Sequence, residues 1–198
     1  RAAVTSNRPP QNPREVFLLP FVSEKIKQLN EDGFFVAIVS NQGGFNETYS
    51  MTDAERTLLQ TVEATAKAGA LIHYFDFSEA PGHDKKPDIG MAERLENFLQ
   101  KKFSAIIDRD HSIMIGDSGW LGVSPQGVSG ELRPDGRYGF SRSNSDRKFA
   151  ENLGVKYIEA PDFFGWKNCT QLEQILTYDD LTRALDNCEK KLLHRRVL

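Results

Sequence analysis

The sequence predicts an α/β fold in which a doubly wound parallel sheet lies between two layers of helices. The first support is alternation, because short apolar runs are separated throughout by amphipathic segments of helical period. The second is FFVAIV at residues 34–39, which is continuously apolar, as expected of a strand buried on both faces. A chain of 198 residues with 39% hydrophobic and 27% charged residues has the length and composition of one globular domain.

The first half of the chain opens with a polar, Pro-rich stretch at residues 1–14, which predicts a loop. A helix is expected after Pro20 and stops at Gly33, and its buried face is expected to consist of Val22, Ile26 and Leu29. The strand at residues 34–39 follows. The capping-box pattern TDAE at residues 52–55 predicts the next helix, whose apolar face comprises Leu58, Leu59 and Val62.

The second half of the chain continues the alternation. Strands are expected at ALIHYFDF (70–77), SIMIGD (112–117) and VKYI (155–158). The helix between the first two of these has an apolar side made of Met91, Leu95, Phe98 and Leu99. A Gly-, Ser- and Arg-rich loop at residues 118–142 precedes the helix SDRKFAENL, with Ser143 as its expected cap and Gly154 as its expected stop. An amphipathic helix at residues 181–192 comes last.

Composition narrows the classes of function. The net charge is −3, so any surface that binds nucleic acid must be local. Cys169 and Cys188 lack metal-ligand spacing, which predicts neither a zinc site nor a disulfide framework, and no apolar run is long enough to span a membrane. We expect one domain at residues 1–168 and a helical extension at residues 169–198. The chain starts with Arg1 rather than Met, so we expect a longer gene product.

Three polar loops are associated with the first three strands: SNQGG (40–44), HDKKP (83–87) and GDSGW (116–120). Because ligands of open α/β sheets bind at the carboxyl ends of the strands, we expect these loops to lie side by side. Ser40 and backbone N–H groups can donate to phosphate oxygens, Lys86 can offset phosphoryl charge, and Asp117 is a hard oxygen ligand suited to Mg²⁺. Taken singly, SNQGG reads equally well as a Gly-rich turn, whereas the other two loops are more simply interpreted as a solvated lysine pair and a turn aspartate. Their combination favours a site for a phosphate and a divalent cation.

The order of these motifs resembles the haloacid dehalogenase superfamily of phosphatases, with a Ser/Thr at a strand end, a Lys before a helix and a GD motif. The closer resemblance is to the phosphatase module of the polynucleotide kinase 3′-phosphatase family, and it covers residues 13–165. SNQGG resembles that family's second motif, and KKPDIGM (85–91) resembles its K-P-x-x-G-M segment. The block FSRSNSDRKFAENLGVKYIEAPDFF (140–164) resembles its last and most specific segment.

The chain departs from that family at its front. The family's first motif, D-x-D-G-T, supplies the aspartate nucleophile and an acid/base aspartate, and it does not occur in residues 1–198. Either this motif and the first central strand precede Arg1, or the protein is catalytically inactive. We favour the first explanation because the other motifs are intact, and because a sheet without its central strand leaves neighbouring strand edges unpaired.

The resemblance implies a phosphomonoester hydrolase that uses Mg²⁺ and an aspartyl-phosphate. It implies that the catalytic residues of this chain are Ser40, Lys86 and Asp117, with Asp117 also a metal ligand. The implied substrate-binding residues are Asn41, Gln42, Gly43, Lys85, Arg137 and Arg142; Asn41 either donates to the phosphate or positions its loop. Asp146 is a secondary acidic candidate, or else a first-turn aspartate favoured by the helix dipole.

The substrate follows from what surrounds the motifs. The segment before Lys86 has no cysteine, so the zinc loop of histidinol-phosphate and heptose-bisphosphate phosphatases is absent, and no insertion is large enough to form a cap. An uncapped site admits a DNA end. Five basic residues near the GD loop either follow the phosphate backbone of DNA or belong to an ordinary mixed surface, since acidic residues are interspersed among them; they are Arg133, Arg137, Arg142, Arg147 and Lys148. Trp120 either packs locally or stacks on a terminal base.

We therefore expect a polynucleotide 3′-phosphatase that acts on DNA ends in strand-break repair. We expect a monomer inside the cell, in the nucleus if the organism is a eukaryote and otherwise in the cytoplasm, with no membrane partner. The alternatives are a small-metabolite phosphatase of the histidinol-phosphate or sugar-phosphate type and an inactive module that binds phosphorylated ends. The chain contains no P-loop pattern, so it carries no kinase half.

Overall fold

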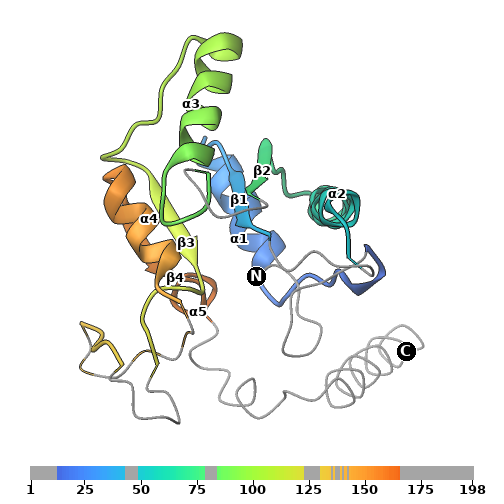
Figure 1. Ribbon diagram of the computed structural model, residues 1–198. Coiled ribbons are helices and arrows are strands. Elements are labelled where there is room, and N and C mark those ends of the chain that lie inside the picture. The colour runs from blue at the N-terminus through green and yellow to red at the C-terminus, as the bar shows by residue number, and fades with distance from the viewer. Residues whose placement is uncertain are drawn as a thin grey trace.

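The computed structural model describes residues 13–42, 49–78, 84–122, 130–134, 136, 139, 141 and 143–165. Figure 1 shows its elements, which in chain order are η1 (Pro13–Glu15), α1 (Val22–Glu31), β1 (Ala37–Asn41), α2 (Met51–Lys67), β2 (Tyr74–Ser78), α3 (Gly90–Phe103), β3 (Ile113–Gly116), α4 (Ser145–Leu153), β4 (Lys156–Glu159) and α5 (Ala160–Phe164). The alternation of strands and helices confirms the α/β class. The helix expected at residues 181–192 lies outside the described residues.

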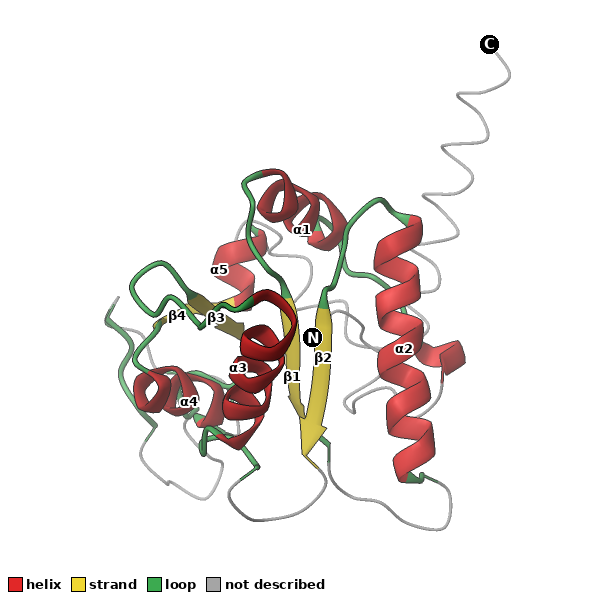
Figure 2. Ribbon diagram, turned by 90° about the horizontal axis from the view of Figure 1, so that it is seen from above, coloured by secondary structure: helices red, strands yellow, loops and turns green. Residues whose placement is uncertain are grey.

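The described strands form two parallel pairs. β1 pairs with β2, with Ser40 opposite Phe77, and β3 pairs with β4, with Gly116 opposite Glu159. Figures 1 and 2 show the pairs side by side, with β1 and β3 as the strands that face each other. The parallel direction was expected. The single continuous sheet was not found among the described residues, because no hydrogen-bonded ladder joins β1 to β3 there.

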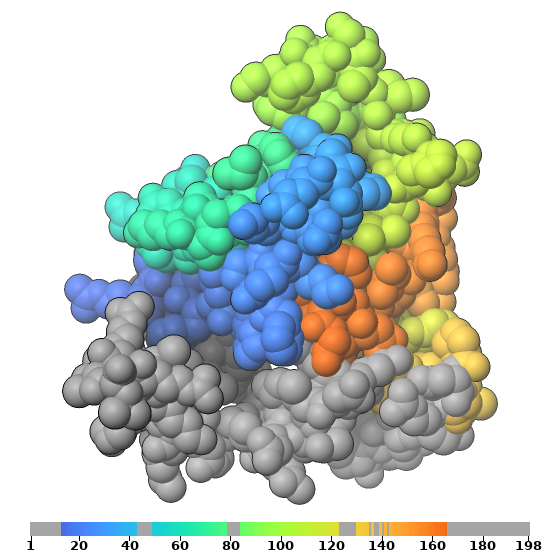
Figure 3. Space-filling model, turned by 180° about the vertical axis from the view of Figure 1, so that it is seen from behind, coloured from blue at the N-terminus to red at the C-terminus, as the bar shows by residue number. Residues whose placement is uncertain are grey.

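Helices cover these strand pairs with small apolar clusters. Val22 and Ile26 of α1 pack with Ala70, and the partly buried Phe164 of α5 joins them. In Figure 3 the blue surface of α1 accordingly borders the orange surface of the last described residues. On β2, α3 packs through Phe98, whose ring centre lies 5.1 Å from that of Tyr74, and α4 packs on β3 and β4.

The first strand differs from its prediction in position and burial. It begins at Ala37 and extends through Ser40 to Asn41. Phe34 and Phe35, which were expected inside it, precede it and are 42% and 37% exposed. All five strand residues are only half-buried, since β1 has a single strand neighbour among the described residues.

The second helix also differs from its prediction. Its N-cap is Ser50, two residues before the expected capping box, and the Ser50 and Asp53 side chains each accept a hydrogen bond from the other's backbone N–H. Leu59, expected on the buried face, is 42% exposed. A row of three threonines is buried instead: Thr57, Thr61 and Thr65. The hydroxyl of each donates to a backbone carbonyl one helical turn earlier. Burial of these polar groups is tolerated because each is satisfied within the helix.

Helix ends confirm two of the predicted stops. Gly33 follows α1 with φ +82°, and Gly154 is the C-cap of α4 with φ +76°, a backbone region that favours glycine. The predicted cap of α4 is displaced by one residue, because Asn144 occupies the N-cap position while Ser143 Oγ accepts from Ser145 N at 3.1 Å. No helix in the described part of the chain is long and apolar enough to cross a bilayer.

Candidate functional site

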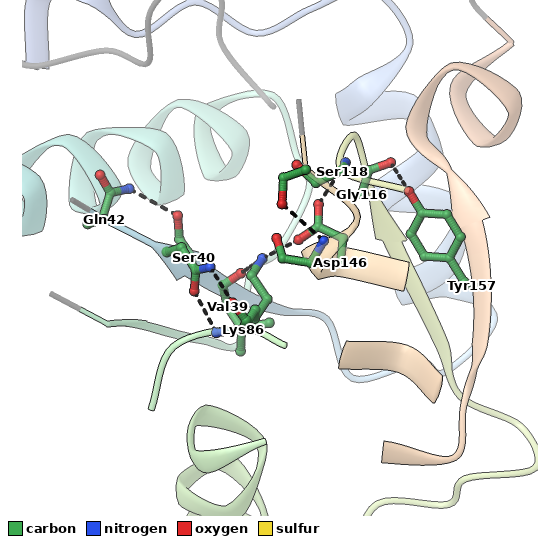
Figure 4. A network of polar contacts seen from close by, with 11 residues as sticks. Val39, Ser40, Gln42, Lys86, Gly116, Ser118, Asp146 and Tyr157 are labelled. Atoms are coloured by element: carbon green, nitrogen blue, oxygen red, sulfur yellow. Dashed lines mark hydrogen bonds and ion pairs between the residues drawn. The ribbon is translucent and has the colours of Figure 1, made fainter. Parts of the chain in front are cut away.

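The carboxyl ends of β1 and β3 bring together the polar residues that the sequence singles out. Ser40 and Asn41 end β1, and Asp117 follows directly after β3. Lys86 lies in the turn that precedes α3. Figure 4 shows Ser40, Lys86 and the segment at Ser118 within one network of polar contacts. The three predicted loops therefore meet at one edge, as the parallel arrangement requires.

Lys86 is the buried cation of this network. Its side chain is 8% exposed, and its ammonium group donates to Val39 O at 2.9 Å and lies 2.7 Å from Asp146 Oδ1. The Asp146 side chain is also 8% exposed. A buried charge needs a partner of opposite charge and satisfied hydrogen bonds, and each of these residues supplies that for the other. Asp146 is thus a partner of Lys86, and its position in the first turn of α4 is compatible with a favourable helix dipole as well.

Asp146 also fixes the loop that carries Asp117. Ser118 N donates to Asp146 Oδ2 at 3.1 Å, and Asp146 N donates to Ser118 O at 3.0 Å. The carboxylate approaches the strand so closely that a Cβ at Gly116 would lie 2.4 Å from Asp146 Oδ2. Glycine at this position therefore allows α4 to deliver the carboxylate to the site.

Asn41 and Asn152 hold the segment that carries Lys86. Asn41 Nδ2 donates to Lys86 O at 2.9 Å, and Lys86 N donates to Asn41 Oδ1 at 2.8 Å. On the other side, Asn152 Nδ2 from α4 donates to Pro87 O at 2.9 Å. Both ends of the Asn41 amide are engaged in this way. Of the two roles considered for Asn41, the geometry supports positioning of the loop over donation to a phosphate.

Gln42 contacts Ser40 directly. Gln42 Nε2 donates to Ser40 Oγ at 3.0 Å, and the Tyr49 hydroxyl donates to Gln42 Oε1 at 2.8 Å. Tyr49 is 3% exposed. Sequence reasoning missed this tyrosine, because it precedes α2 in an otherwise polar segment and nothing in the pattern places it beside Ser40.

Two further residues missed by sequence reasoning lie beneath the GD loop. The Tyr157 hydroxyl donates to Gly116 O at 3.0 Å. Burial, with the charges of Glu159, Asp146 and Asp117, raises the pKa of Tyr157 and keeps its phenol protonated. Burial likewise raises the pKa of Glu159, which is 5% exposed, and Arg133 opposes that shift. Both side chains sit on β4, where alternation gives no sign of a functional role.

The donors fit Mg²⁺ only in part. Across the described residues, no three His, Cys, Asp or Glu side chains come together as a metal site. The two Asp146 oxygens are engaged with Lys86 and Ser118 N. Asp117 is a carboxylate that follows directly after β3, and Mg²⁺ commonly binds proteins through one or two carboxylates together with phosphate oxygens. Asp117 can therefore contribute one ligand.

Two of the arginines considered for contact with a DNA phosphate backbone are instead engaged with carboxylates. Arg133 is 8% exposed and lies 3.4 Å from Asp162. Arg147 is paired with Glu131 at 2.9 Å and Glu151 at 2.5 Å. These guanidinium groups neutralise neighbouring carboxylates and are not presented to a nucleic-acid backbone. Lys85 and Lys148 are exposed. Three predicted binding residues lie outside the described residues, namely Gly43, Arg137 and Arg142.

Trp120 has one face covered by protein. The Arg147 guanidinium carbon lies 4.2 Å from the centre of the Trp120 ring, and Arg147 Nε donates to Gly119 O at 2.9 Å. This contact supports the local packing considered for Trp120. Base stacking stays a prediction and is restricted to the opposite face of the indole.

Comparison with known proteins agrees with this geometry. The family model described as polynucleotide kinase 3 phosphatase matches residues 4–164. A protein of Acanthamoeba polyphaga mimivirus, named putative bifunctional polynucleotide phosphatase/kinase, is 24% identical over 149 residues. That match covers 72% of this chain and 35% of the viral protein, so the chain spans about a third of the length of this curated relative.

Among solved structures, D,D-heptose 1.7-bisphosphate phosphatase from B. bronchiseptica, complexed with magnesium and phosphate, is similar with a TM-score of 0.50. The sequences are 13% identical, and the match covers 87% of this chain and 93% of that one. At this identity the similarity concerns the fold alone. Since the family match extends over most of the sequence, the chain belongs to the polynucleotide kinase 3 phosphatase family within the haloacid dehalogenase superfamily.

Proposed function

We propose that this protein is a Mg²⁺-dependent polynucleotide 3′-phosphatase that restores 3′-hydroxyl groups at DNA ends during strand-break repair. The observation that carries the proposal is the buried Lys86 ammonium group, held between the end of β1 and Asp146. This places a fixed cation beside Ser40, at the strand edge where Asp117 also lies. A hydroxyl donor, a cation and a carboxylate are the groups that phosphoryl transfer requires.

Each residue has a distinct proposed role. The Ser40 hydroxyl donates to an oxygen of the phosphoryl group. Lys86, paired with Asp146, offsets the negative charge of that group, and Asn41 keeps the Lys86 backbone in place. Asp117 would contribute a ligand to Mg²⁺, which when bound supplies further neutralisation of phosphate charge.

We propose that the attacking aspartate belongs to a D-x-D-G-T motif that residues 1–198 do not contain. Its strand would lie between β1 and β3. One feature supports this placement: no ladder joins β1 to β3 among the described residues.

The polynucleotide substrate is supported by the family and by the printed name of the mimivirus relative. A DNA end is larger than a sugar phosphate and needs an open site. The segments between the described elements are too short to form a cap domain over such a site. The boundaries at residues 1–168 and 169–198, the monomeric state and the nuclear or cytoplasmic location stay predictions.

The proposal is tested by phosphate release from a 3′-phosphorylated oligonucleotide, measured with the full-length protein. We expect Mg²⁺-dependent release that falls about 100-fold or more in Ser40→Ala and Asp117→Asn, the scale of losing an electrostatic stabiliser. Lys27→Met, a change on the exposed side of α1, is the control and should leave the rate unchanged. Turnover of a sugar bisphosphate in place of the oligonucleotide would favour a small-metabolite phosphatase. End-selective binding without turnover of either substrate would favour an inactive binding module.

A further inference from the structure

Three side chains form a hydrogen-bonded row that ends on Ser40. The Tyr49 hydroxyl donates to Gln42 Oε1 at 2.8 Å, and Gln42 Nε2 donates to Ser40 Oγ at 3.0 Å. Figure 4 shows the Gln42–Ser40 contact at the tip of β1. The row links the residue that precedes the cap of α2 to the hydroxyl assigned to the phosphate.

Both ends of the middle residue are fixed. Gln42 N donates to Ser78 O at 2.8 Å, which continues the hydrogen bonding between β1 and β2 beyond Asn41. At the other end, Tyr49 is buried and holds the amide oxygen. Burial and the charge of Asp53 raise the pKa of Tyr49, so its phenol stays protonated and remains able to donate.

The row has a direction, because a carboxamide offers an acceptor oxygen at one end and a donor nitrogen at the other. Since the Tyr49 hydroxyl donates to the oxygen of Gln42, the NH₂ group of Gln42 faces Ser40. Ser40 Oγ is then occupied as an acceptor by that group, and its own proton is directed to a further acceptor. Phosphate dianion oxygens are acceptors only, so this is the orientation that a bound phosphate requires.

We propose that Tyr49, acting through Gln42, is a positioning residue that orients the Ser40 hydroxyl as a donor to phosphate. The inference rests on the proposed function in one respect, since it takes a phosphate group to bind beside Ser40. It also changes the role of Gln42. The sequence suggests Gln42 as a direct ligand of the substrate, whereas the row makes it the link that fixes the orientation of Ser40.

Isothermal titration calorimetry of the full-length protein with inorganic phosphate tests the proposal without requiring turnover. Tyr49→Phe is expected to weaken phosphate binding about 3- to 10-fold, the effect of losing one oriented hydrogen bond. Gln42→Leu should weaken it by a similar factor, and it serves as a second variant if burial makes Tyr49 sensitive to change. Tyr74→Phe is the matched control. It removes a hydroxyl that donates to Asp76 at 3.3 Å, outside the row, and should leave the affinity within about twofold of the parent.

The decisive comparison uses a Ser40→Ala background. There Tyr49→Phe is expected to have no further effect on phosphate affinity, because the hydroxyl that it orients is gone. An equal loss in both backgrounds, an unchanged affinity in Tyr49→Phe, or no phosphate binding by the parent protein would each overturn the inference.

Turnover separates this inference from the proposed function. Weaker phosphate binding by Tyr49→Phe, together with no release of phosphate from a 3′-phosphorylated oligonucleotide by the parent, would retain the positioning role and remove the polynucleotide activity. Release of phosphate from the oligonucleotide by the parent, together with unchanged phosphate binding by Tyr49→Phe, would retain the polynucleotide activity and remove the positioning role.

Discussion

Replacing Lys86 by methionine should strongly destabilise the fold. The substitution keeps the length of the side chain but removes the ammonium group. Among the described residues, the Asp146 carboxylate, which is 8% exposed, then retains Ser118 N as its partner. Removing one member of a buried ion pair typically costs about 3–5 kcal/mol, because the remaining charge is buried without compensation. The lost bond to Val39 O adds to this cost.

Lys27→Met is the matched control for this prediction. Lys27 and Glu31 form an ion pair at 4.0 Å in which the side chains are 57% and 58% exposed. Exposed pairs contribute about 0–1 kcal/mol, so the control should change the free energy of unfolding by no more than that. Urea denaturation followed by far-UV circular dichroism measures both variants under the same conditions.

One further result would support the same explanation. Adding Asp146→Asn to Lys86→Met should recover part of the lost stability, because the buried charge is gone. A loss in Lys86→Met of under about 1 kcal/mol, or one equal to that of Lys27→Met, would refute the assignment of a buried, mutually dependent pair.

Three other substitutions follow from the described contacts. Ser50→Ala should cost about 1 kcal/mol of unfolding free energy through loss of the N-cap bond to Asp53 N at 3.2 Å, and a larger loss in Thr52→Ala would contradict this cap. Gly116→Ala should destabilise the protein as Lys86→Met does, since the added Cβ would lie 2.4 Å from Asp146 Oδ2; unchanged denaturation would contradict that approach. The pKa of Glu159 is raised, so the folded state binds the carboxyl proton more tightly than the unfolded state does. The free energy of unfolding therefore falls as the pH rises above the ordinary pKa of a glutamate. Glu159→Gln should reduce that fall, and identical pH profiles would contradict it.

Much of the site follows from the sequence because it depends on strand order. A continuously apolar run ending in SNQGG predicts a strand end, and the parallel alternation brings that end next to the loops of Lys86 and Asp117. The structure places Ser40, Lys86 and Asp117 at one edge for this reason. Parallel pairing follows from the alternation of strands and helices along the chain, and this alternation can be recognised in a single sequence.

The partners of these residues could not be predicted, because they depend on how separate segments pack. No sequence pattern pairs Tyr49 with Gln42, and Asp146 reaches Lys86 only because α4 packs on β3. The sequence left open whether Arg147 faces nucleic acid or lies among acidic residues, and its carboxylate partners come from its own helix and from a distant loop.

Local capping was ambiguous for a different reason. Ser50 and Thr52 are both good N-cap residues with an acidic residue three positions later, so the pattern alone does not decide between them. The buried threonine row of α2 was missed because an apolar-face analysis treats threonine as polar, whereas its hydroxyl can be satisfied within the helix.

The most direct test of the central claim uses one DNA oligonucleotide that carries a phosphate at both its 3′ and 5′ ends. The full-length protein is incubated with this oligonucleotide and Mg²⁺, and the products are identified by mass spectrometry after digestion from each end. We predict loss of the 3′-phosphate alone, yielding a 3′-hydroxyl and an intact 5′-phosphate, and a rate of loss about 100-fold or more lower in Asp117→Asn. Retention of the 3′-phosphate under conditions in which the same protein hydrolyses a small phosphomonoester would contradict the claim.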